Sequence, residues 1–89
     1  MTQVYKRSES AIQTSVKKRL EKNGWIVEKF RTFRNGHADL IAFRAGVTIF
    51  IETKRKGEKL RPLQEARRRQ LQAAGFKFYS IDDPLILEI

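Results

Sequence analysis

The sequence predicts an α/β fold in which a mixed sheet of about four strands is flanked by two helices. Apolar residues recur at helical spacing in two segments, one ending at Asn23-Gly24 and the other at Gly75. Four further segments are rich in β-branched and aromatic residues and are separated by turn residues. The second helical segment lies between two strand segments, and such a crossover implies that those two strands pair in parallel.

The first helix is expected to begin near Ser8 or Ser10, after a lead-in of residues 1–7 that we expect to be mobile. Its buried stripe is predicted to consist of Ile12, Val16 and Leu20. Glu9 lies on the same stripe, because seven residues before Val16 is close to two helical turns. Its carboxylate either stabilises the helix N-terminus or points towards acids elsewhere in the fold, and spacing alone leaves both readings open.

A β-hairpin is predicted from Ala38–Phe43 and Val47–Lys54, on either side of a Gly-containing break. If the loop is Ala45-Gly46, paired residue numbers sum to 91 and Asp39 lies directly opposite Glu52. A three-residue loop that includes Arg44 competes with this register and would put the two acids on opposite faces, unless a bulge compensates. Carboxylates placed roughly 5 Å apart repel each other, so a bound cation would stabilise the pair.

The remaining elements follow from turn and helix signals. Trp25–Phe33 is predicted to be a strand, with Asn35-Gly36 turning the chain into the hairpin. Pro62 suits the first position of the second helix. The predicted inner stripe of that helix is Leu63, Ala66, Gln70, Leu71 and Ala74. Phe76–Ile81 returns as a strand, and the apolar tail 85–89 fits an edge strand, a core plug or a subunit contact.

Composition points to a polyanionic partner. The net charge is +9, from 19 Lys and Arg against 10 Asp and Glu, and the basic residues cluster between Lys54 and Arg69. There is no cysteine, which excludes a disulfide framework and thiolate metal sites. No apolar run approaches the roughly 18 residues that a membrane span needs. We therefore expect one cytoplasmic domain over residues 1–89, without a membrane partner.

Four residues of the hairpin have the chemistry of a metal-assisted hydrolase. Asp39 and Glu52 offer the carboxylate oxygens that Mg²⁺ prefers, and the backbone carbonyl of Thr53 points near the same place. Lys54 shares a strand face with Glu52 and would place its ammonium near a scissile phosphate. Taken alone, a Glu-x-Lys sequence is weak support, because such a pair often forms only a surface ion pair worth under about 1 kcal/mol.

The Asp and the Glu-x-Lys together, at their spacing, are a more specific signal than Glu-x-Lys alone. An Asp that opens one strand, thirteen residues before a Glu-x-Lys that closes the next, resembles the PD-(D/E)xK nuclease superfamily. The detailed pattern is similar to its VRR-NUC branch, with these matching segments: Ser8-Glu9 through Gln13, Gly36-His37-Ala38-Asp39-Leu40, Phe50-Ile51-Glu52-Thr53-Lys54 and Leu60-Arg61-Pro62-Leu63-Gln64. One departure is Ala38, where the superfamily name has Pro; it affects strand entry rather than ligand chemistry.

The resemblance implies a restriction-endonuclease-like core and a DNA nuclease that depends on Mg²⁺ or Mn²⁺. It implies metal ligands at Glu9, Asp39 and Glu52, a catalytic cation at Lys54 and a supporting active-site residue at Gln64. Small stand-alone members of this branch resemble homodimeric Holliday-junction resolvases, whereas large eukaryotic relatives act on flaps. A homodimer acting on branched DNA is therefore the expected assembly.

Several readings stay open beside this one. Without the resemblance, Gln64 would be read as a helix cap, and a non-catalytic DNA-binding module would also explain the charge. His37 is treated as a candidate phosphate contact, although a solvated loop residue is favoured. The other candidate DNA contacts are the basic residues of the second half: Arg55, Lys56, Lys59, Arg61, Arg67, Arg68 and Arg69.

Overall fold

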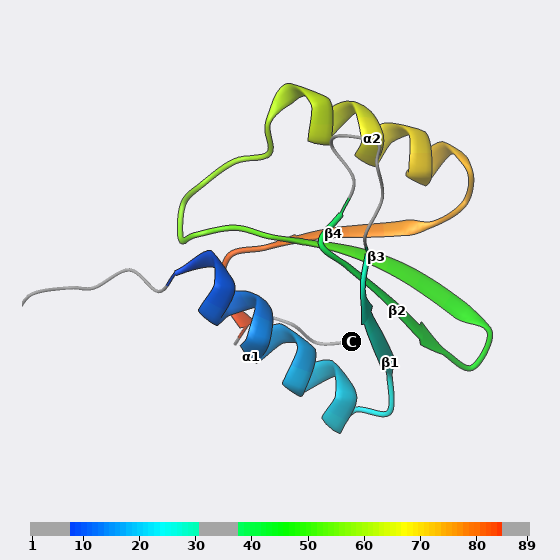
Figure 1. Ribbon diagram of the computed structural model, residues 1–89. Helices are drawn as coiled ribbons and strands as arrows, with labels where there is room; N and C mark the ends of the chain where they lie inside the picture. The colour runs from blue at the N-terminus through cyan, green and yellow to red at the C-terminus, as the bar shows by residue number, and fades with distance from the viewer. Residues whose placement is uncertain (1–7, 31–37, 85–89) are drawn as a thin grey trace, which may run out of the picture.

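The structure is a computed structural model that describes residues 8–30 and 38–84. The elements are α1 (Glu9–Lys22), β1 (Ile26–Lys29), β2 (Leu40–Arg44), β3 (Val47–Thr53), α2 (Pro62–Ala73) and β4 (Lys77–Ile81). The strands form one sheet in the order β1-β2-β3-β4, antiparallel from β1 to β3 and parallel between β3 and β4. The α1 helix covers one face of this sheet and α2 the other (Figure 1). The predicted α/β fold with a mixed sheet is confirmed.

Some predicted features lie outside the described residues. These are the lead-in 1–7, the end of the first predicted strand with the Asn35-Gly36 turn and His37, and the tail 85–89. Within the described residues, no helix is long and apolar enough to cross a membrane.

The hairpin has the two-residue loop. Arg44 pairs with Val47 and Leu40 with Ile51, so the paired numbers sum to 91 along the whole ladder. Ala45 and Gly46 both have positive φ, 50° and 78°, which is the backbone of the tight turns whose twist matches that of antiparallel strands. The even register is confirmed, although Ala is an uncommon residue for the first of these positions.

Asp39 and Glu52 do not form the expected direct pair at the end of the hairpin ladder. The amide of Asp39 donates to the carbonyl of Ile51 at 3.0 Å, while Leu40 is also paired with Ile51. Asp39 and Leu40 therefore both lie opposite Ile51, as in a β-bulge, and the described pairs stop before Glu52. The bulge redirects the Asp39 side chain at the point where the strands separate.

The α1 face of the sheet carries the larger core. The predicted stripe of α1 is fully buried and packs against residues from all four strands, with Leu40 and Ile51 among them. Ser8 caps the helix, since its side-chain oxygen accepts from the amide of Ala11. Glu9, the first residue of α1, therefore lies in the first turn of a capped helix.

The α2 face is smaller and aromatic. Phe50 lies at its centre, and its ring meets those of Phe30 and Phe76 edge-on, with centroids 5.6 Å and 5.5 Å apart. Leu71 is the member of the predicted α2 stripe that packs against this cluster.

The other members of that stripe are exposed, so the predicted inner face of α2 is wrong apart from Leu71. Leu63 is 52% exposed, whereas Arg67 is the buried residue of α2 at 9%. The inner face therefore follows Gln64, Arg67 and Leu71, which recur at helical spacing. An arginine can occupy such a position because its long aliphatic stem covers apolar surface.

Candidate active site

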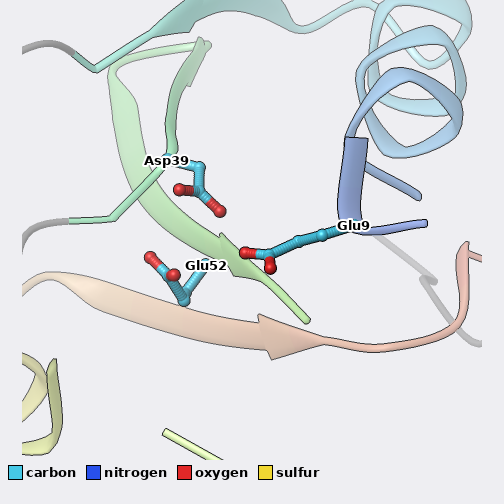
Figure 2. Close-up of side chains that lie close together, drawn as sticks. All are labelled: Glu9, Asp39 and Glu52. Carbon is cyan, nitrogen blue, oxygen red and sulfur yellow. The ribbon is translucent and has the colours of Figure 1, made fainter. Parts of the chain in front are cut away.

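Three carboxylates from three different elements meet at one end of the sheet. Glu9 begins α1, Asp39 directly precedes β2, and Glu52 lies near the end of β3. One oxygen of each carboxylate lies within 4.8 Å of the others. Figure 2 shows the three side chains pointing toward one another. Of the two readings of Glu9, the structure therefore favours the one in which it faces the hairpin's acids.

Thr53 holds Asp39 in place from the neighbouring strand. Its amide donates to Oδ2 of Asp39 at 2.9 Å and its hydroxyl donates to the same oxygen at 2.8 Å. Two donors on one oxygen fix the orientation of the carboxylate. The sequence suggested only the backbone carbonyl of Thr53 as a ligand, which stays a prediction. The clamp was missed because it depends on the bulge at Asp39, which leaves no sequence pattern.

Glu52 is the most deeply buried of the three acids, at 2% exposed. Burial, followed by the negative charge of Asp39 and then that of Glu9, raises the pKa of Glu52 to about 8, against the opposing charges of Lys54 and Arg61. The carboxylate is thus poorly compensated by the protein alone. A buried acid of this kind, beside other acids, is typical of functional sites.

Lys54 and Gln64 both contact the same oxygen of Glu52. The ammonium of Lys54, itself buried, lies 3.9 Å from Oε1 of Glu52. The side-chain amide of Gln64 donates to this oxygen at 2.8 Å, while its own Oε1 accepts from the backbone amide of Arg61 at 3.0 Å. Gln64 therefore caps α2 and contacts Glu52 at once. Its role as a supporting active-site residue stays a prediction.

The donor set fits a hard divalent cation. All three groups are carboxylates, whose oxygens are the ligands that Mg²⁺ and Mn²⁺ prefer. The second oxygen of Glu52, Oε2, is buried and makes no hydrogen bond with the described residues. An orphaned buried carboxylate oxygen is costly unless something else satisfies it. The cluster therefore offers the ligands of a metal site, and it contains a buried carboxylate oxygen that a bound cation would satisfy.

The candidate DNA contacts differ in their placement. Arg55, Lys56, Lys59 and Arg61 are exposed on the segment between β3 and α2. On α2, Arg68 bonds to Glu65, and Arg69 lies 3.8 Å from the same carboxylate. Arg67 is buried and donates to Gln70 instead of lying on the open surface. A direct phosphate contact from Arg67 would require its guanidinium to leave this position.

Comparison with known proteins agrees with the geometry. The sequence profile of the VRR-NUC domain matches residues 2–82. A solved structure described as a VRR_NUC domain superposes with a TM-score of 0.80 and 26% sequence identity, over 86% of each chain. No match is found among curated proteins. The chain therefore belongs to the VRR-NUC domain family, a family of nuclease type.

Proposed function

We propose that the protein is a metal-dependent endonuclease that hydrolyses phosphodiester bonds in branched DNA. The observation that carries the proposal is the meeting of Glu9, Asp39 and Glu52 within 4.8 Å, with the buried Lys54 beside them. A structural ion pair alone would not bring together three acids, one of them with an unsatisfied buried oxygen.

Each residue of the cluster has its own role in the proposed reaction. Glu9, Asp39 and Glu52 would hold Mg²⁺ or Mn²⁺, which when bound supplies charge neutralisation at the phosphate and a more acidic water. Glu52 serves as a ligand in its deprotonated form, and Gln64 keeps its carboxylate oriented by donating to Oε1. Lys54, whose ammonium lies 3.9 Å from that oxygen, would donate to a phosphate oxygen as negative charge develops there.

Cleavage of a labelled four-way junction tests the proposal. With Mg²⁺, the wild type should cut, whereas Asp39→Asn and Lys54→Met should lose cutting and keep most of their DNA binding. Glu28→Gln is the matched control, because it neutralises an exposed acid of β1 and should cut normally. Binding without cutting by the wild type at any Mg²⁺ or Mn²⁺ concentration would instead favour the non-catalytic DNA-binding module.

The preference for branched DNA and the homodimer belong to the same proposal. Symmetric incision of a four-way junction needs two active sites, which a two-fold dimer provides. Support comes from Ile26 and Phe43, which pair across β1 and β2 and are 64% and 40% exposed. Adjacent exposed apolar side chains of this kind are common at protein contacts.

Two measurements test the dimer and the preference for branched DNA separately from the nuclease activity. Light scattering with and without DNA should give twice the monomer mass, and a monomer in both conditions would contradict the dimer. Equal cutting rates on a junction, a flap and a linear duplex would contradict the preference for branched DNA while leaving the nuclease assignment intact.

A further inference from the structure

A hollow of about 300 Å³ lies on the α1 side of the acid cluster. Its lining residues are Ser10, Gln13, Thr14, Lys17, Lys18, Glu21, Lys29 and Leu40. Ser10 directly follows Glu9, and Leu40 directly follows Asp39. The hollow therefore begins beside two of the three metal-site acids.

Most of the residues that line the hollow belong to one face of α1. Its helical lining runs from Ser10 to Glu21 at spacings of three and four residues, which lie on one side of a helix. Eleven residues span about 16 Å at 1.5 Å per residue. A single DNA strand advances 3.4 Å per nucleotide in B-form DNA, so this length corresponds to roughly five nucleotides. A lining of this length suits an extended strand better than a compact ligand.

The charges of the hollow are unbalanced. Lys17, Lys18 and Lys29 line it against one acid, Glu21, and none of the four forms an ion pair with another described residue. Lys18 and Lys29 are exposed, so their ammonium groups are available to a ligand in solution. The side chains of Ser10 and Gln13 add hydrogen-bonding groups at the end nearest the acids.

Basic groups also lie on the opposite side of the acid cluster. Arg61, at the start of α2, is close enough to lower the pKa of Glu52 by its charge, although burial and the other acids outweigh it. Gln64, three residues later, donates to that carboxylate. The acids therefore lie between the α2 segment on one side and the lysines of α1 and β1 on the other.

We propose that this hollow holds the sugar-phosphate backbone of the cleaved strand on one side of the scissile phosphate. Lys18 and Lys29 are its principal phosphate contacts, with Lys17 beside them. The inference rests on the proposed nuclease function and adds a binding surface to it. Because contacts to phosphate carry no sequence information, the hollow confers affinity and strand direction without sequence preference.

Paired variants of equal charge test this surface. Lys18→Gln with Lys29→Gln removes two positive charges inside the hollow. Lys22→Gln with Lys77→Gln removes two exposed lysines that do not line it. Binding to a labelled junction is measured in EDTA over a range of salt concentrations.

The hollow variant should bind at least tenfold more weakly than the wild type at 0.1 M salt. Its plot of log affinity against log salt should become shallower by about 1.8, since each lost phosphate contact contributes about 0.9. The control pair should stay close to the wild type in both quantities. Equal losses in the two double variants would overturn the proposal, because the lysines would then act only through net charge.

A second measurement tests the direction of the strand. Substrates are shortened so that the cut strand ends a few nucleotides to the 5′ side or to the 3′ side of the incision. The hollow variant should bind more weakly than the wild type, and this difference should vanish when the strand is shortened on one side of the incision. It should persist when the strand is shortened on the other side. A difference in binding that neither truncation changes would overturn the proposal. A wild type that fails to cut would refute the nuclease function alone, because the EDTA binding comparison does not depend on cutting.

Discussion

Glu52 should make the metal-free protein less stable as the pH rises. The folded state keeps this carboxyl protonated up to about pH 8, whereas the unfolded chain releases the proton near 4.5. The folded state therefore binds more protons between these values, and the free energy of unfolding falls as pH rises through this window and levels off above it. At 1.36 kcal/mol per pH unit, the full difference corresponds to ~5 kcal/mol, of which about 3 kcal/mol falls between pH 5 and pH 8.

The assay is urea unfolding in EDTA at several pH values, followed by circular dichroism, for the wild type and Glu52→Gln. Gln cannot ionise, so the variant should lack the part of the pH dependence that Glu52 causes. Comparing slopes with pH, rather than stabilities at one pH, removes any effect of the substitution that does not depend on pH. Mg²⁺ added at pH 8 should restabilise the wild type and leave the variant unchanged. Identical slopes in the two proteins would refute the reasoning that burial and neighbouring acids raise the pKa of Glu52.

Further predictions concern the supports of the site and the core beneath it. Thr53→Val removes the hydroxyl donor to Asp39 and should weaken Mn²⁺ binding by at least tenfold in calorimetry, whereas Thr53→Ser should bind nearly as the wild type. Gln64→Ala leaves Glu52 Oε1 without its amide donor, so single-turnover cutting at saturating DNA should slow while the Kd for DNA stays within twofold; unchanged cutting would reduce Gln64 to a helix cap. Leu20→Ala removes a fully buried side chain and should lower the free energy of unfolding by about 3 kcal/mol in urea, and a loss under 1 kcal/mol would show that α1 is not tightly packed on the sheet.

The α1 stripe was predictable because local rules determine it, whereas the even hairpin register was one of two readings that the sequence left open. Ile12 and Val16 recur at helical spacing with a single apolar face, and Gly46 supplies one of the two positive φ values that a two-residue loop requires. Parallel pairing of β4 with β3 followed from the helix between them. The proximity of Asp39 to Glu52 was expected from the even register, whereas spacing alone left the direction of Glu9 open between two readings.

The parts that sequence did not predict depend on contacts across the fold. The α2 stripe was assigned by counting apolar residues such as Leu63, but Gln64 faces the sheet because it reaches Glu52. Its helical neighbour Arg67 is buried as a consequence of that orientation. The bulge at Asp39 and the hydrogen bonds from Thr53 to the Asp39 carboxylate arise where two strands separate. The alternation of side chains along a strand carries no signal for either feature.

An anomalous difference map from crystals grown with Mn²⁺ tests the central claim most directly. The account predicts one or more peaks among Glu9, Asp39 and Glu52, with an oxygen of each carboxylate coordinated to manganese. The same map from Asp39→Asn crystals should show the peak weakened or absent. A wild-type map with no peak at the three acids, at a manganese concentration that supports DNA cutting, would contradict the assignment of this cluster as the metal site.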